Sequence, residues 1–549
     1  MSSDGGVTPS AHNQAELLTD VDIARSQRPT QPQREPIVAP PNSAAMHPSM
    51  PDASPQLLPY LSLLKRSQED GRAELTAVQV RELSEALAKH PALAFARDAS
   101  GNTLMPTLLQ IYQGSRLVEC INLVLRANSG AAAEAEAKGG RLPLHLALEG
   151  LEHYEQAAES VMLLLLAHPA AAAIKTPEGL LPLHAAAKSL VGNMSAAWRP
   201  GVVASMHALL DAHPSAACVA GPDGWLPLHT VVRYSGACIG TAACVRLLLE
   251  AHSDGAREAA DGWLPLHLTY SMRLGPDAAE CVLQLLKAHP DAVSTPLPDG
   301  WLLLHHEVNA LGGDTASLNI LQQLLAAYQG AVCEPTPDGW LPLHLAARNV
   351  GAGVGCVACV RVLLAANADV ASKCGPDGNL PLHHAIQAAS GSSESVARAL
   401  KCIRGLLKAY PGSAEISGAE RCLPLHFLTR RMDGSEGGVE CLRALLDAYP
   451  AAAGRKNAAG ALPLHLLSAN ARHPPVEAVR LLLAAFPEAL NTEDAEGRTP
   501  VELAEQCGAA PELIDELRRA STANGESKLR MVNEGRASKP QFFNMNTLI

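Results

Sequence analysis

Apolar residues recur along most of this chain at a fixed interval. The tetrapeptide Leu-Pro-Leu-His occurs eight times, and Leu302-Leu-Leu-His305 occupies the same register once. Successive histidines of this motif are mostly 38 or 39 residues apart, with two longer intervals of 43 and 45. Nine copies in register predict a chain built from internal repeats rather than from unrelated globular domains.

Residues 338–378 show the elements expected in one unit. Asp338-Gly339 predicts a turn, because glycine adopts positive φ without strain. Pro342 suits the first position of a short helix, where its missing N–H is not needed. Residues 351–355 are glycine-rich and predict a break, after which apolar residues at helical spacing predict a second helix over 359–366. Since neither helix can bury its apolar face alone, neighbouring units are expected to stack.

Composition narrows the class of protein. Apolar residues make up 47 % of the chain but aromatic residues only 3 %, which indicates helices packed through Ala and Leu rather than a β-sandwich. The net charge of −12 argues against a nucleic-acid partner, since phosphate binding needs clustered Lys and Arg. No apolar stretch is long enough to insert into a membrane, and the N-terminus lacks a secretory signal. An intracellular protein, cytoplasmic or nuclear, is therefore expected.

The repeats resemble those of the ankyrin family, whose units contain a turn with Asp and Gly, then Thr-Pro-Leu-His and an outer helix rich in Val and Leu. The likeness recurs from about Leu142 to Gly497. Two departures are clear: the family period is 33, and a leucine such as Leu226 or Leu341 replaces the threonine, which removes the usual hydroxyl N-cap. The resemblance implies an all-α, ankyrin-type solenoid of about twelve helix-loop-helix repeats with short β-hairpin fingers and disordered termini.

Composition and register together suggest a division of the chain. The repeat array is expected over residues 56–520, flanked by a disordered Pro-rich tail over 1–55 and a polar tail over 521–549. Within the array we expect degenerate capping units over 56–139, clear repeats over 140–495 and a C-terminal cap over 496–520.

The motif histidines raise the question of a metal or catalytic site. Stacked helices lie about 8–10 Å apart, whereas metal–nitrogen bonds are about 2 Å long, so successive histidines cannot share one ion. The family resemblance implies a structural role, with hydrogen bonds in the turn and the helix start. No metal and no cofactor are expected at His145, His184, His229, His267, His305, His344, His383, His426 and His465.

A set of cysteines shares one position of the outer helix, eight residues before its closing residue. Ser, Ala or Ile fills this position in other units, so it requires mainly a modest buried side chain. Cys356-x-x-Cys359 matches the spacing of a redox pair, but it lacks the βαβ context of one. Core packing is the favoured role for Cys244, Cys281, Cys359, Cys402 and Cys441.

Four tryptophans are the most informative feature for function. Trp225, Trp263, Trp301 and Trp340 each follow an Asp-Gly pair in four consecutive units. The ankyrin resemblance places this position near the finger tip, on the partner-facing surface. Two interpretations remain open and compatible: an exposed aromatic stripe that binds a partner, or rings that lie on their neighbours and stiffen the fingers.

The resemblance also implicates residues four and five positions after the motif histidine, late in the inner helix. Beside the tryptophans they would form an aromatic and cationic groove wall that suits a peptide with apolar and acidic residues. These candidates are Arg233, Tyr234, Ser271, Met272, Asn309, Arg348, Asn349, Arg430 and Arg431.

Enzyme motifs are absent: the chain has no phosphate-binding loop, no nucleophile elbow and no zincin or kinase motif. We therefore expect a monomeric, non-enzymatic scaffold or adaptor that binds a protein on a concave repeat surface. The alternative is a regulatory or targeting subunit whose tails recruit an effector while the repeats bind a substrate protein. Weak linear motifs at Pro29–Arg34 and Thr547–Ile549 fit ligands of polyproline-binding and PDZ domains. An enzyme hidden in the inter-helix loops is a distant third hypothesis.

Overall fold

The computed structural model describes residues 73–97, 101–152, 156–190, 199–234, 240–272, 277–310, 315–351, 353–389, 392–432, 435–470 and 475–522. The chain divides into two units, Met1–Ser54 and Pro55–Ile549, and all described residues belong to the second. The tail expected over 1–55, both linear motifs, and residues 523–549 of the second expected tail lie outside the described residues. Residues 521 and 522 end a helix.

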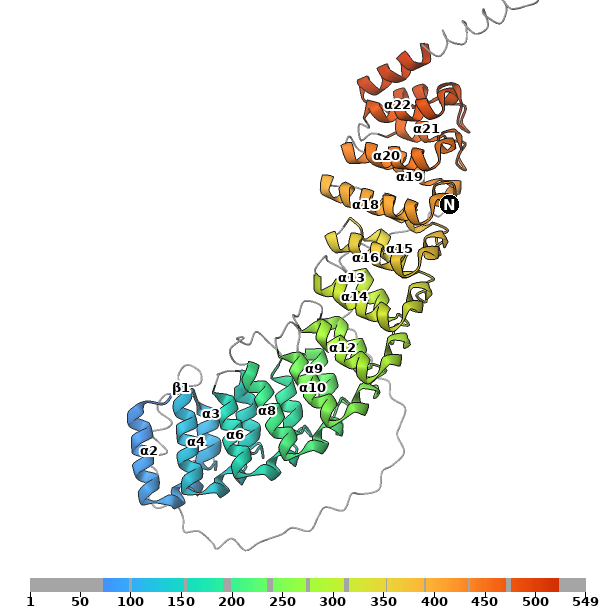
Figure 1. The fold of residues 1–549 in the computed structure, drawn as a ribbon. Coiled ribbons are helices and arrows are strands. Elements are labelled where there is room, and N and C mark those ends of the chain that lie inside the picture. Colours follow the sequence, from blue (N-terminus) through green and yellow to red (C-terminus); the bar gives the residue numbers. More distant parts are fainter. Residues whose placement is uncertain are drawn as a thin grey trace, which may run out of the picture. The chain divides into compact units, whose positions relative to one another are not determined.

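Short inner helices alternate along the chain with longer outer helices (Figure 1). The inner helices are α3 (Leu104–Ile111), α5 (Pro143–Glu149), α7 (Pro182–Lys188), α9 (Pro227–Tyr234), α11 (Pro265–Leu268), α13 (Leu303–Ala310), α15 (Pro342–Arg348), α17 (Pro381–Gln387), α19 (Pro424–Arg431), α21 (Pro463–Ser468) and α23 (Pro500–Gln506). The outer helices are α2 (Ala77–Lys89), α4 (Ser115–Ala127), α6 (Ala157–Ala167), α8 (Arg199–Ala212), α10 (Thr241–Ala251), α12 (Ala278–Ala288), α14 (Thr315–Ala327), α16 (Val354–Ala366), α18 (Ser393–Ala409), α20 (Glu436–Ala448), α22 (Val476–Ala485) and a helix over residues 511–522.

Each inner helix packs against its own outer helix and against the next inner helix, and outer helices pack on one another in the same order, as α15, α16, α17 and α18 show. This arrangement confirms the predicted fold class, an all-α solenoid of two-helix repeats. The start of the inner helix at Pro342 is as predicted, whereas α16 begins at Val354, inside the glycine-rich stretch where a break was expected. One glycine inside a helix costs only about 1 kcal/mol, and burial of Cys356 and Cys359 on the same helix offsets it.

A 3₁₀ turn follows each outer helix that joins the next finger. The closing residue, for example His168, leaves the helical region, and Pro169 then starts the 3₁₀ turn that buries Ala171 and Ala172. These turns are η3 (Pro91–Phe95), η4 (Ser129–Ala133), η6 (Pro169–Ala173), η7 (Pro214–Cys218), η8 (Ser253–Ala256), η10 (Pro290–Ser294), η11 (Gln329–Cys333), η12 (Ala368–Ser372), η13 (Pro411–Ala414), η15 (Pro450–Gly454) and η16 (Pro487–Asn491). Shorter 3₁₀ segments occur at η5 (Gly150–Glu152), η9 (Thr269–Met272) and η14 (Ala419–Arg421).

Strand structure is sparse in the described ranges. Strand β1 (Ala73–Glu74) pairs in parallel with β2 (Tyr112–Gln113), with Ala73 opposite Tyr112. The fingers are closed by turn hydrogen bonds: Leu297 N–H donates to the Trp301 carbonyl at 2.8 Å, and Gly300 N–H donates to the Leu297 carbonyl at 2.8 Å. Ala260 and Trp263 form an isolated antiparallel bridge. The fingers are thus minimal hairpins that position the residue after Asp-Gly at the start of each inner helix.

The core is a nearly continuous apolar layer between the two rows of helices. Leu343 of α15, together with Cys359 and Leu363 of α16, has no exposed surface. Burial of one such leucine stabilises the fold by about 1.5–3 kcal/mol. Because every unit shares its core with its neighbours, stability is expected to depend on the contact between units as much as on each unit.

Neighbouring fingers also touch at their tips. A Cβ built on Gly300, where φ is +81°, would lie 2.6 Å from Cγ of Pro337 in the following finger. Gly224 has nearly the same φ, +80°, but nothing lies within 4 Å of its Cβ position, because Ala260 stands where the next finger would have proline. Equivalent glycine–proline contacts join Gly140 to Pro177, Gly179 to Pro222, Gly262 to Pro298 and Gly339 to Pro376.

This difference gives a matched pair of substitutions. Gly224→Ala introduces only backbone strain and is expected to destabilise the protein by about 1–2 kcal/mol. Gly300→Ala adds a clash with Pro337, so we expect a further loss of about 1–3 kcal/mol. Urea unfolding followed by circular dichroism measures both. Equal losses for the two variants would show that the finger tips contribute no packing.

Candidate protein-binding surface

Most motif histidines join their own unit to the next, and His383, whose Nε2 has no hydrogen-bond partner in the described part of the chain, is an exception. In His305, Nδ1 accepts a hydrogen bond from the Leu302 backbone N–H at 3.0 Å, while Nε2 lies 2.9 Å from the Glu334 carbonyl. Since Nδ1 accepts, the ring carries its proton on Nε2 and donates it to the following unit. The imidazole thereby accepts from the N–H of the N-cap residue, as the Glu502 carboxylate accepts from Thr499 N–H in the last motif helix. Both bonds recur at His145, His267, His426 and His465.

Burial keeps these histidines neutral. Desolvation lowers the pKa of His267, His344, His383 and His426 to about 4, and it lowers the pKa of His305 as well. Within the described ranges, no three His, Cys, Asp or Glu side chains gather in a way that could hold a metal ion. The geometry of these residues is that of structural hydrogen-bonding groups.

The cysteines at the shared outer-helix position are all buried, with at most 1 % of their surface exposed. Burial raises the pKa of Cys244, Cys281, Cys402 and Cys441 to about 12, and it raises the pKa of Cys359. A thiol in this state is a poor nucleophile. Cys356 and Cys359 are both buried, so the CxxC spacing arises here from two core residues on one helix.

The four tryptophans are half-buried. Each indole packs against the apolar core and leaves part of its surface in solvent. Trp225 lies under the Arg233 guanidinium, whose Cζ is 5.4 Å from the ring centroid. Trp340 also reaches the next finger, since its Cζ3 would lie 3.0 Å from a Cβ on Gly375. Both interpretations of these rings therefore have support: they pack on neighbours and they remain accessible.

Two histidines that directly follow the motif histidine contact the tryptophan rings: His306 is half-buried and His384 is buried. His306 contacts the rings of Trp301 and Tyr270, with centroids 5.1 and 5.4 Å apart, and its Nε2 lies 2.7 Å from the Asp299 carboxylate. Asp299 is the turn aspartate seven residues earlier.

The same arrangement recurs two units later. The His384 ring lies 5.3 Å from Trp340, and its Nε2 is 3.4 Å from Asp377, again seven residues earlier. Sequence reasoning missed both histidines. The signal that could have found them is the doubled His-His, which stands at a fixed distance from an Asp-Gly turn.

The late inner-helix candidates are dispersed. Arg233 is half-buried against Trp225, and Tyr234 is 41 % exposed. Asn349 donates from Nδ2 to the Asn309 carbonyl at 3.0 Å, which links two successive inner helices.

The remaining inner-helix candidates are exposed arginines or have side chains outside the described residues. Arg348, Arg430 and Arg431 are exposed, but Arg430 and Arg431 belong to a unit that has Cys422 in place of tryptophan. The side chains of Ser271 and Met272 lie outside the described residues. Among the described candidates, the predicted pairing of aromatic and cationic side chains is seen directly at Trp225 and Arg233.

Comparison with known proteins finds repeats of one family in part of the chain. Residues 304–410 match a family model described as ankyrin repeats (3 copies). The chain is similar to the crystal structure of the ankyrin repeat domain of Bcl-3, described as a member of the IkappaB protein family, at 20 % identity and a TM-score of 0.35. That likeness covers 48 % of this chain and 99 % of the Bcl-3 domain. No curated protein matches the sequence. Across the described ranges, every helix falls short of the length and apolar character that spanning a bilayer requires.

Proposed function

This chain is an ankyrin-repeat protein, and from that premise we propose that it acts as a non-enzymatic scaffold or adaptor. Ankyrin repeats are in general modules of protein–protein interaction. The proposed mechanism is rigid display: stacked units hold the fingers and inner helices as one preformed concave surface, so binding loses little ordering entropy. The proposed partner is a protein, in keeping with a net charge of −12 that disfavours nucleic acid.

The observation that supports this proposal is the row of half-buried tryptophans at Trp225, Trp263, Trp301 and Trp340. Tryptophan is enriched at binding hot spots because a rigid ring buries much area at little entropic cost. The neighbouring Arg233 adds a fixed cation. A partner segment with apolar and acidic side chains would complement this surface.

Replacement of Trp263 and Trp301 by alanine tests the proposal. Hot-spot substitutions weaken binding by about 2 kcal/mol or more each, so partner recovery in a pull-down is expected to fall at least tenfold. The control is Leu166→Ala, which removes a side chain that is 82 % exposed on outer helix α6. Circular dichroism verifies that the fold persists. Unchanged partner recovery by a folded Trp variant would refute a binding role for the stripe.

A second candidate is a regulatory or targeting subunit whose tails recruit an effector, and the weak motif at Pro29–Arg34 is the observation behind it. Deletion of residues 1–55 and 521–549 distinguishes the two. A scaffold keeps its partners after the deletion, whereas a targeting subunit keeps the repeat-bound substrate and loses the effector.

A further inference from the structure

The outer helices near the C-terminal end of the array are joined by a regular series of ion pairs. An arginine two residues after the shared buried position pairs with a glutamate one residue before the equivalent position of the next helix. The N–O distances are 2.7–2.8 Å in Arg404–Glu440, Arg443–Glu477 and Arg480–Glu516. This outer ion-pair series therefore runs from α18 to the helix over residues 511–522.

One step earlier, between α16 and α18, the arginine of the series is kept but a second cation replaces the glutamate. Arg361 occupies the arginine position of α16, but Lys401 stands in α18 at the position that is Glu440, Glu477 and Glu516 in the three following outer helices. Both side chains are exposed. Within the described part of the chain, no ion pair joins either of them to a carboxylate. Two uncompensated cations thus occupy a step whose equivalents hold one cation and one anion.

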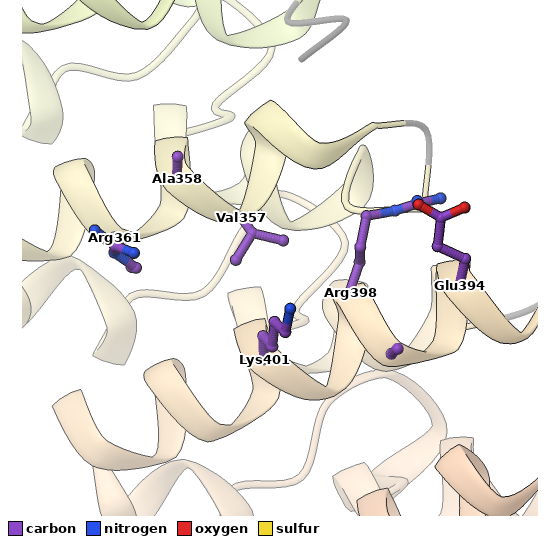
Figure 2. A pocket seen from close by; sticks show the side chains of 7 residues that line it. Val357, Ala358, Arg361, Glu394, Arg398 and Lys401 are labelled. Atoms are coloured by element: carbon purple, nitrogen blue, oxygen red, sulfur yellow. The ribbon is translucent and has the colours of Figure 1, made fainter. Parts of the chain in front are cut away.

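A groove of about 320 Å³ lies between these two helices (Figure 2). Its apolar surface comes from Val357, Ala358 and Ala397. The charge of a third cation, Arg398, is already paired: its guanidinium lies 2.9 Å from Glu394 and donates to the Gly351 carbonyl at 2.9 Å, although its Nε has no hydrogen-bond partner among the described residues. The charge that remains available in the groove is therefore that of Arg361 and Lys401.

We propose that this groove docks an acidic segment of a partner protein. In this arrangement a carboxylate of the segment lies between Arg361 and Lys401, as Glu440 lies against Arg404 one step later, and an apolar side chain covers Val357 and Ala397. The apolar floor favours a peptide over a nucleic acid, because phosphate backbones are bound by extended sets of cations rather than by two cations around an apolar patch. The site is formed by outer helices, so it is separate from the tryptophan surface and does not depend on it.

The direct test is fluorescence anisotropy of the full chain with a labelled peptide whose centre is Glu-Leu-Leu-Glu between Gly-Ser flanks. We expect the peptide to bind, with an affinity that falls as salt rises. The variant Lys401→Glu restores the local charge pattern of the series, since the introduced carboxylate can pair with Arg361, and is expected to weaken binding at least tenfold with an unchanged melting temperature. Lys287→Glu, an equal charge change on an exposed position of α12, should bind as the unmodified chain does.

Charge exchange makes the test specific. The double variant Arg361→Glu with Lys401→Glu is expected to reject the Glu peptide and to bind a Lys-Leu-Leu-Lys peptide instead.

The proposal is overturned if the unmodified chain does not bind the Glu peptide, if a Gln-Leu-Leu-Gln peptide binds equally well, or if Lys401→Glu and Lys287→Glu have equal effects. It is also overturned if a single-stranded oligonucleotide displaces the peptide at lower concentration than the unlabelled peptide does, or if sedimentation shows that a second copy of the chain fills the groove. Because Trp263→Ala leaves this groove intact, loss of the finger surface and loss of the groove are distinguishable.

Discussion

On acidification from pH 7 to pH 4.5, the repeat array is expected to lose several kcal/mol of its free energy of unfolding. The motif histidines are the cause. Their folded-state pKa is lowered by burial, to about 4 at His267, His344, His383 and His426, whereas an unfolded histidine titrates near 6.5.

The direction in which stability changes with pH follows from proton binding. Between pH 6.5 and pH 4 the unfolded chain binds protons that the folded chain excludes, so stability rises with pH in this window and is lost as pH falls. About one unit above pH 6.5 both states are neutral at these sites and the contribution becomes constant. Each histidine can contribute up to about 1.4 kcal/mol per pH unit, and because the four with a folded-state pKa of about 4 act together over about two units, the summed loss is on the order of 10 kcal/mol.

Urea midpoints at pH 7.5, 6.5, 5.5 and 4.5 measure this dependence. We expect a shallow fall between pH 7.5 and 6.5 and a steeper, progressive fall below pH 6.5. Carboxylates with lowered pKa, such as Glu502 and Glu516, contribute only near and below pH 4.5, so they do not produce the fall at pH 5.5. A midpoint that stays constant down to pH 5 would contradict the neutral, buried state of the motif histidines.

Replacement of His305 by alanine is expected to destabilise the protein by about 3 kcal/mol or more. The substitution leaves the Leu302 N–H and the Glu334 carbonyl without their partner and opens a cavity in a position with no exposed surface. The adjacent His306 provides the control. It is half-buried and contacts a surface carboxylate and two rings, so His306→Ala should cost about 1 kcal/mol or less.

Thermal and urea unfolding of the two variants, compared with the unmodified chain, measure the difference. His305→Ala should also reduce the pH dependence of stability, because one excluded proton is removed from the balance. If the two variants are equally stable, the hydrogen bonds of the motif histidine do not determine the cohesion between units.

The sequence predicts the fold well because the same local signals recur. Proline at the first helical position places the start of α15 at Pro342, and the repeated motif predicts stacking. The start of α16 was missed, since the glycines around Gly353 and Gly355 suggest a break while packing against α18 favours a helix. The low helix propensity of glycine disfavours a helix here, whereas burial against α18 favours one, and the free energy of burial outweighs the propensity.

The candidate surfaces were predicted less completely. The position of the tryptophans follows from the turn that precedes them, but the contacts of His306 and His384 arise between side chains of neighbouring units. The proximity of Arg361 and Lys401 depends on the register of two outer helices. It becomes visible only after those helices are aligned. Both features belong to packing between repeats, which periodicity within one repeat does not encode.

The hydrogen bonds from motif histidines such as His305 to the following unit bear on how the protein can gain or lose repeat units. His145, His305 and His426 all reach a main-chain carbonyl 29 residues downstream, and a carbonyl is supplied by any amino acid. The histidine of one such unit can therefore bond to the carbonyl of any other such unit that follows it. Gain or loss of one such unit by recombination would leave these bonds made, with Thr499 and Glu502 still closing the last motif helix through their own reciprocal bonds.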